Sequence, residues 1–251
     1  MLTSSALVLF FIFGPLAHVV LSPDPQIFWE TLHDADVLRS IWLSLSASAV
    51  AAGIALVFGT PLAYLLARRE FPGKRLVESC IDLPIMIPHP VVGIALLSIA
   101  GRGHWIGDAL HAVGVSLMGS VTGIVAVLVF VGMPFFVDTV KAGFEGVPSR
   151  LENVSRSLGA PPGATFWRIT LPLSWRHLLV GLILCMARAI SEFGAIVIVA
   201  YHPMVAPVLM YERFTAYGLK YSQPVAVILI LVSMLFFLFL RMVSQPRRRA
   251  S

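Results

Sequence analysis

Six long apolar stretches alternate with shorter polar segments along the chain. About 20 residues of helix are needed to cross the hydrocarbon core of a bilayer, so each stretch has roughly the length of one crossing. The pattern predicts an all-α, polytopic membrane protein of six transmembrane helices, joined by short loops and one long loop between the fourth and the fifth. The stretches run roughly over residues 5–21, 41–67, 81–100, 121–137, 178–201 and 224–240.

The first stretch is short and carries Gly14 and Pro15. A secretory signal peptide has a similar apolar core, but it also needs a basic segment before that core. The first Lys or Arg of this chain is Arg39, and no small-x-small cleavage site follows Leu16. We therefore expect a retained transmembrane helix.

Composition excludes an ordinary soluble domain. Of the 251 residues, 58% are hydrophobic and 12% are charged, whereas about a quarter of a soluble domain is charged. The two cysteines, Cys80 and Cys185, are too few for a disulfide framework or a four-ligand zinc site. We expect no bound metal.

Lys and Arg residues fall mainly on alternate loops. Thirteen of the 18 lie after the second stretch, after the fourth and in the C-terminal tail, while four lie on the other side and Arg188 lies within the fifth stretch. Cytoplasmic loops are enriched in these residues, so both termini are predicted to be cytoplasmic in a chain of the cytoplasmic membrane. The arginines at 247–249 are expected to anchor the tail near anionic lipid. The basic excess therefore needs no nucleic-acid partner.

Proline and glycine interrupt three of the stretches. Such breaks are tolerated at membrane depth only where neighbouring helices, water or a cavity satisfy the freed backbone groups. We therefore predict that these helices border a translocation pathway, although a buried structural role is the simpler interpretation for His89. The interrupting residues are Pro84, Pro88 and Pro90 in the third stretch, Gly132 and Pro134 in the fourth, and Gly194 in the fifth.

Arg188 and Glu192 are charged residues at predicted membrane depth. A charge at the centre of a bilayer costs about 2.5–3.5 kcal/mol on insertion scales, and residues four apart share a helix face. Mutual pairing is the simpler interpretation. Alternatively, Arg188 supplies positive potential to the path of an anion and Glu192 shapes the break. The candidate pathway residues are Pro88, His89, Arg188, Ser191, Glu192, Phe193 and Gly194.

The loop over residues 141–177 is too long for a plain connection. Ser149 and Glu152 have the spacing of a capping box, which predicts a helix from Arg150. Leu151, Val154 and Leu158 form one apolar stripe, and Gly159 is placed to end the helix in the left-handed conformation. Pro161 and Pro162 then prevent its continuation, and a second short element is expected before Pro172. By itself, this amphipathic helix could lie on the membrane surface or dock on a partner.

The order Glu152, Gly159, Ile169, Leu171, Pro172 resembles the EAA loop of the membrane subunits of ATP-binding-cassette (ABC) importers. Nine residues separate Gly159 from Ile169, as in the family pattern, but the usual alanine pair is absent. In that family the loop forms a coupling helix that docks into a groove of the ATPase subunit. The resemblance therefore implies a coupling set of Glu152, Val154, Ser155, Leu158, Gly159, Ile169, Leu171 and Pro172.

Further segments are similar to the molybdate and tungstate permeases. They are residues 71–74, 82–89, 190–195, 201–207 and 211–214. The resemblance implies the type I importer fold, with two copies of this chain, two cytoplasmic ATPase subunits and an external oxyanion-binding protein. It also implies an N-terminal transmembrane helix and external loop at 1–36, a transport domain at 37–241 and a basic cytoplasmic tail at 242–251. Permeases for sulfate, thiosulfate or phosphate are alternatives.

No nucleotide-binding motif is present in this sequence. A P-loop needs G-x-x-x-x-G-K-[ST], whereas the only Gly-Lys pair, Gly73-Lys74, is followed by Arg75. Metalloprotease and serine-hydrolase motifs are also absent. We therefore expect no enzyme and no cofactor in this chain, with ATP and Mg²⁺ on the partner ATPase. A transporter driven by an ion gradient is a less favoured alternative, because the EAA pattern argues against it.

Overall fold

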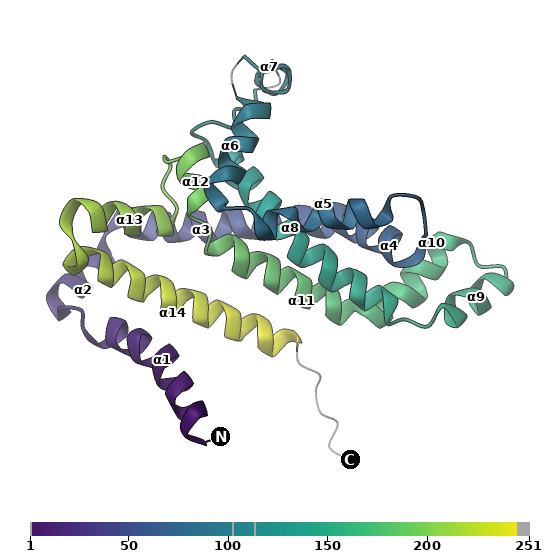
Figure 1. Cartoon of the computed structure of the whole chain (residues 1–251), viewed down its shortest axis with the longest axis horizontal. Helices are drawn as coiled ribbons and strands as arrows, with labels where there is room; N and C mark the ends of the chain where they lie inside the picture. The colour runs from purple at the N-terminus through teal and green to yellow at the C-terminus, as the bar shows by residue number, and fades with distance from the viewer. Residues whose placement is uncertain (1, 102, 113, 245–251) are drawn as a thin grey trace. The chain divides into compact units, whose positions relative to one another are not determined.

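The computed structural model describes residues 2–101, 103–112 and 114–244, and within these ranges the secondary structure is helical without strands (Figure 1). The all-helical fold class is therefore confirmed. Arg102 and the tail arginines at 247–249, which entered the topology prediction, lie outside the described residues. The division into 1–36, 37–241 and 242–251 stays a prediction.

Contacts among the described residues divide the chain into two compact units. The first lies within Met1–Ser44 and Pro203–Phe236, and the second lies within Leu45–His202 and Phe237–Ser251. Two helices, α3 (Ala35–Ile54) and α14 (Leu219–Ser244), contribute to both.

The first unit contains α1 (Leu2–Leu21), α2 (Pro25–His33), α13 (Ala206–Tyr217) and parts of α3 and α14. Polar contacts join these helices. Arg213 donates to Asp34 over 2.6 Å, and the amide of Ala206 donates to Ser44 Oγ over 2.8 Å. Burial works to raise the pKa of Asp34, but the hydrogen bonds from Arg213 and from the amide of Asp36 outweigh it, so that pKa lies below its usual 3.8.

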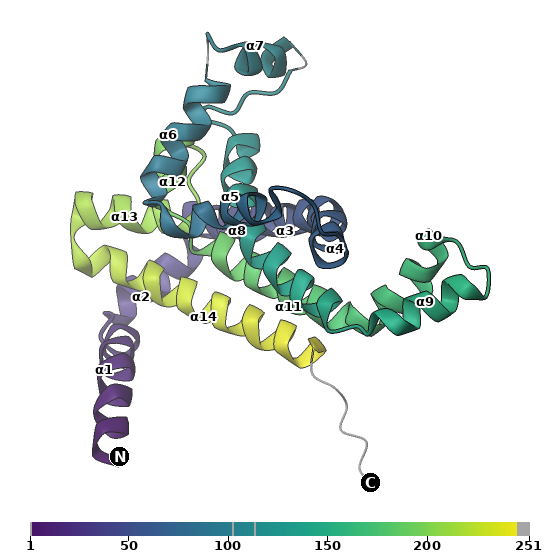
Figure 2. The same cartoon turned by 45° about the vertical axis from the view of Figure 1, so that its right-hand side comes forward.

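The second unit packs around α8, which lies along α11 in both views (Figures 1 and 2). Its buried core includes Phe136, Phe144 and Cys185. A Cβ on Gly132 would lie 2.7 Å from Cys185 Sγ, so a glycine is needed where these two helices approach. The elements are α4 (Thr60–Arg68), α5 (Lys74–Met86), α6 (His89–Ala100), α7 (Trp105–Ala112), α8 (Val121–Glu145), α9 (Ser149–Ser157), α10 (Pro162–Thr165), α11 (Leu171–Ile190) and α12 (Gly194–Val199).

Two π-helical turns are inserted into the long helices of this unit. The turn η1 (Ala55–Gly59) joins α3 to α4, and η2 (Phe166–Thr170) joins α10 to α11. Helix continues through both turns, so Ala35–Arg68 and Pro162–Ile190 are each one long helix. The second and fifth predicted stretches, 41–67 and 178–201, therefore differ from these helices at their ends.

Five of the described helices are long and apolar enough to cross a membrane, and a bent pair brings the number to six if it counts as one crossing. The pair is α5 and α6, which meet at 117°. The predicted break among the prolines of the third stretch is therefore confirmed at Ile87 and Pro88. This is a multi-pass membrane protein.

The predicted break in the fourth stretch, by contrast, is not present in the structure. Helix α8 continues through Pro134 without interruption. A proline in a helix removes one backbone donor, whereas the buried contacts of Gly132, Phe136 and Val137 on either side of Pro134 hold α8 in place.

Candidate functional site

Helix α9 forms the amphipathic element predicted in the long loop. The helix ends at Ser157, and Gly159 just past its end has a φ of +87°, the left-handed conformation expected there. The amide of Gly159 donates to Arg156 O over 2.9 Å and that of Ala160 donates to Ser155 O over 3.1 Å. These two bonds have the register of a Schellman motif, so the predicted helix end is confirmed.

The chain then reverses into α10. Pro162 occupies the first turn of that helix, where its missing amide costs no hydrogen bond. The prediction of a separate short element before Pro172 was wrong, because α10, η2 and α11 form one continuous helix. Pro172 lies in the first turn of α11 and does not end a helix.

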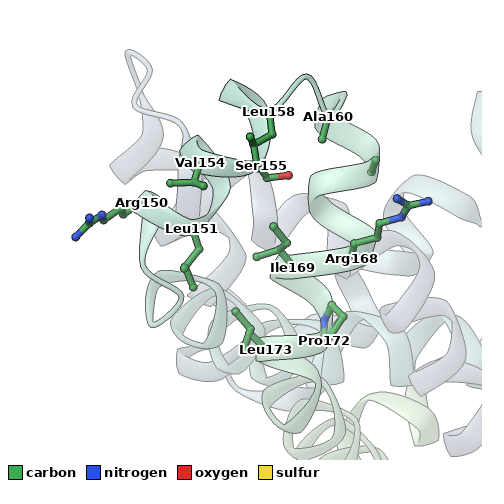
Figure 3. A pocket seen from close by; sticks show the side chains of 11 residues that line it. Arg150, Leu151, Val154, Ser155, Leu158, Ala160, Arg168, Ile169, Pro172 and Leu173 are labelled. Carbon is green, nitrogen blue, oxygen red and sulfur yellow. The ribbon is translucent and has the colours of Figure 1, made fainter.

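An open, mainly apolar groove of about 910 Å³ lies between α9 and the start of this long helix (Figure 3). The predicted stripe faces it and is accessible, since Leu151, Val154 and Leu158 are 43%, 51% and 83% exposed. Ile169 and Leu173 form the opposite wall, and Arg150 and Arg168 add positive charge at the groove. The groove is suited to an apolar segment with acidic neighbours.

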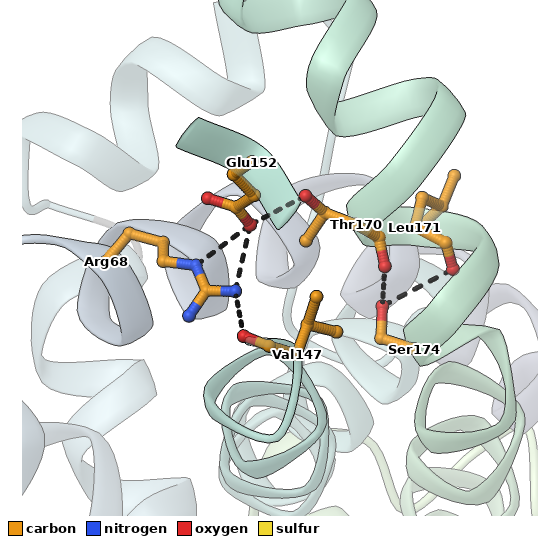
Figure 4. A network of polar contacts seen from close by, with 6 residues as sticks. All are labelled: Arg68, Val147, Glu152, Thr170, Leu171 and Ser174. Atoms are coloured by element: carbon orange, nitrogen blue, oxygen red, sulfur yellow. Dashed lines mark hydrogen bonds and ion pairs between the residues drawn. The ribbon is translucent and has the colours of Figure 1, made fainter. Parts of the chain in front are cut away.

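Glu152 lies outside the groove and is 4% exposed. Its Oε1 atom accepts from Arg68 Nε at 3.0 Å, from Arg68 Nη2 at 2.9 Å and from Thr170 Oγ1 at 2.7 Å (Figure 4). The capping box was therefore a wrong prediction, because α9 has no side-chain cap. A carboxylate gains more from a guanidinium than from a neutral amide.

The coupling set predicted from sequence is thus divided between two environments. Most of its members line the groove, whereas Glu152 forms a buried ion pair with Arg68. Gly159 lies just past the end of α9. Sequence reasoning missed Arg68 and Thr170, which are 84 and 18 residues from Glu152. The members that line the groove are Val154, Ser155, Leu158, Ile169 and Pro172, and Leu171 is not among the lining residues.

A second polar cluster lies where α11 ends. Arg188 Nη2 donates to Glu192 Oε2 over 2.6 Å and lies 2.8 Å from His89 Nε2. Glu192 Oε1 accepts from the amide of Ala195 over 2.9 Å, which holds the first turn of α12. The helix ends at Ile190, before Glu192, yet the predicted pairing of Arg188 with Glu192 is present.

The break between α11 and α12 is packed tightly against α6. A Cβ on Gly194 would lie 3.0 Å from His89 Cβ, and a Cβ on Gly93 would lie 2.8 Å from Ala195 O. Pro88 and Ser191 are exposed and Phe193 is partly buried. The structure thus brings the predicted pathway residues together at one junction of three helices, and their role in translocation stays a prediction. Within the described ranges, no cluster of His, Cys, Asp or Glu could hold a metal ion.

Known proteins share this sequence and this fold. The chain is 42% identical over 244 residues to the molybdate/tungstate transport system permease protein WtpB of Methanocaldococcus jannaschii, covering 97% of this chain and 95% of that protein. It is 32% identical over 227 residues to the sulfate transport system permease protein CysT of Synechocystis sp., covering 88% and 79%. A solved bacterial ABC transporter involved in the import of the acidic polysaccharide alginate matches with a TM-score of 0.74 at 18% identity, covering 100% of this chain and 94% of that chain.

The structural match at this low identity shows the fold, that of a type I ABC importer membrane domain. The sequence match shows the family: residues 55–249 match the description "Binding-protein-dependent transport system inner membrane component". The chain belongs to this family of transport permeases.

Proposed function

We propose that this chain is the permease subunit of an ATP-driven importer that carries molybdate or tungstate across the cytoplasmic membrane. The observation that carries the choice of substrate is the 42% identity to a molybdate/tungstate permease across 97% of the chain. Five long apolar helices, six crossings if the bent pair α5–α6 counts as one, together with broken helices at the proposed pathway suit a subunit that moves its substrate through the bilayer.

The groove beside α9 is the proposed docking surface for a separate ATPase subunit. Exposed leucine and valine side chains on a short helix suit burial against a partner. The sequence has no P-loop, so ATP and Mg²⁺ belong to the partner. Motion of two ATPase subunits would move α9, the proposed coupling helix, in each copy of this chain. This movement would switch the access of the pathway from one side of the membrane to the other.

The proposed assembly contains two copies of this chain, two ATPase subunits and an external oxyanion-binding protein. The binding-protein-dependent family supports the external partner. The distribution of Lys and Arg supports cytoplasmic termini and a cytoplasmic groove.

Sulfate is the second candidate substrate, favoured by the 32% identity to a sulfate permease. Sulfate, molybdate and tungstate are all tetrahedral divalent anions, so the helix junction at Arg188 would serve any of them. The lower identity makes sulfate the less favoured choice. Transport driven by an ion gradient does not agree with a member of this family.

Uptake into sealed vesicles tests the function. The chain is reconstituted with its ATPase and its binding protein, with ATP on the ATPase side and labelled molybdate, tungstate or sulfate on the other. We expect ATP-dependent uptake of molybdate or tungstate that excess sulfate competes with weakly. Uptake of sulfate in preference to both would move the substrate to the second candidate, and uptake without ATP would reject the ATP-driven class.

A further inference from the structure

We infer that Arg68 and Glu152 form a brace that positions the coupling helix, and that Glu152 is not a contact for the ATPase. Glu152 is the acidic residue at the start of the EAA-like segment, and the docking role of that segment in the family suggests a contact with the ATPase. Its environment in this chain indicates an internal one. The inference rests on the proposed docking of an ATPase at the groove.

The brace is buried and its hydrogen bonds are made within the chain. The side chains of Arg68 and Glu152 are 15% and 5% exposed. One carboxylate oxygen accepts from both Arg68 nitrogens and from Thr170. A partner could reach this oxygen only by displacing a charged, buried donor.

The brace connects four parts of the second unit. Arg68 is the last residue of α4, Glu152 lies in α9, and Thr170 ends η2. Arg68 Nη2 also donates to Val147 O over 2.9 Å, in the turn between α8 and α9 (Figure 4). Thr170 O in turn accepts from Ser174 Oγ over 2.7 Å. Thus the end of the helix Ala35–Arg68 is tied to the coupling helix and to the start of the next long helix.

The brace and the groove lie on different faces of α9. Residues advance by about 100° around a helix, so the apolar stripe of Leu151, Val154 and Leu158 lies about 100–160° from Glu152, with Ser155 between the two faces. A partner bound in the groove would therefore push on one face of α9, and the brace would transmit the displacement to α4 from the other face. Arg68 and Glu152 are therefore positioning residues for α9, the proposed coupling helix.

The test compares Arg68→Gln, Glu152→Gln and the double variant with Arg69→Gln. Arg69 is the neighbouring arginine and is exposed, so it controls for the loss of one positive charge. The first readout is hydrogen exchange of the α9 amides in the purified chain, which needs no ATPase. We expect exchange in α9 to rise about tenfold in the three brace variants and to stay unchanged in the control.

The second readout uses the reconstituted complex and reports anion transported per ATP hydrolysed, for each assembled complex. We expect the brace variants to retain ATPase binding, because the groove is intact, while transport per ATP falls about fivefold or more. The double variant should be no worse than either single one. A merely structural role would lower the yield of complex but leave this ratio unchanged.

Two results would overturn the brace. One is unchanged exchange in α9 of Arg68→Gln, and the other is loss of ATPase binding in Glu152→Gln alone, which would make Glu152 a docking contact. If Arg68→Gln does not fold, Thr170→Val removes one donor without changing charge and should give the same effects in smaller measure. Faster exchange together with a wild-type chain that binds no ATPase would reject the proposed function and leave the brace standing.

Discussion

Gly159 illustrates how one residue shapes the proposed docking surface. Its φ of +87° is a conformation that L side chains rarely adopt, although a Cβ there would meet nothing within 4 Å. The requirement for glycine is therefore conformational and does not arise from crowding. Leu158 and Ala160, its two neighbours, both line the groove, so strain at Gly159 would change the surface that a partner meets.

Gly159→Ala should weaken ATPase binding about fivefold to thirtyfold, since a left-handed non-glycine residue costs about 1–2 kcal/mol. Gly163→Ala is the matched control, because Gly163 also has open space but no positive φ. Titration of the ATPase onto the reconstituted chain measures the difference. Equal affinities for the two variants would show that the helix end does not shape the docking surface.

Variants of Arg188 and Glu192 can distinguish a structural role of this pair from a role in the translocation pathway. The Glu192 side chain is 0% exposed, so Arg188→Gln leaves its carboxylate without its shortest ionic contact. We expect a loss of about 3–5 kcal/mol in stability and little assembled complex, as measured by thermal unfolding in detergent. The variant with both Arg188→Gln and Glu192→Gln should recover assembly because no buried charge is left unpaired.

Transport by the double variant then decides the role of Arg188. If Arg188 supplies positive potential to the anion, the assembled double variant transports slowly. Normal uptake by the double variant would restrict the pair to holding the junction of α6, α11 and α12.

At the scale of elements, apolar length predicted the crossings because a membrane span must satisfy its own backbone hydrogen bonds. The breaks at Pro88 and Gly194 could likewise be predicted from residue type. Sequence could not show that the helix through Pro134 stays intact, since this depends on close contact with α11. Nor could it show the partner of Glu152, because Arg68 lies 84 residues away and its sequence context indicates only a basic loop.

The contact of α8 with α11 should be sensitive to single methyl groups. Gly132→Ala places a Cβ 2.7 Å from Cys185 Sγ and 3.3 Å from Cys185 O, so the two helices must separate. Overpacking of this kind costs about 1–3 kcal/mol, and we expect a lower unfolding temperature in detergent. Gly53→Ala, a helical position with nothing within 4 Å, should leave stability unchanged or raise it by about 0.5–1 kcal/mol. Equal destabilisation by both variants would contradict close packing at Gly132.

At the scale of the whole molecule, the side of the membrane on which the groove lies links the fold to the proposed function. A docking surface for an ATPase must face the cytoplasm. One long apolar helix, Pro162–Ile190, lies between α9 and α13 in the described residues. If it crosses the membrane once, α13 faces outward. Ser157 in α9 and Thr215 in α13 are both exposed and suit a labelling test. Replacing the exposed Cys80 with Ser leaves the buried Cys185 as the remaining native thiol.

In this background, Thr215→Cys should react with a membrane-impermeant maleimide in sealed right-side-out vesicles, whereas Ser157→Cys should react only after lysis. The background chain without an added cysteine reports any labelling of Cys185. This outcome follows from the excess of Lys and Arg on the α9 side, which is retained in the cytoplasm. The reverse labelling would place the groove outside, where no ATPase could reach it. Labelling of both sites in sealed vesicles would mean that Pro162–Ile190, the one long apolar helix between α9 and α13 in the described part of the chain, does not cross the membrane.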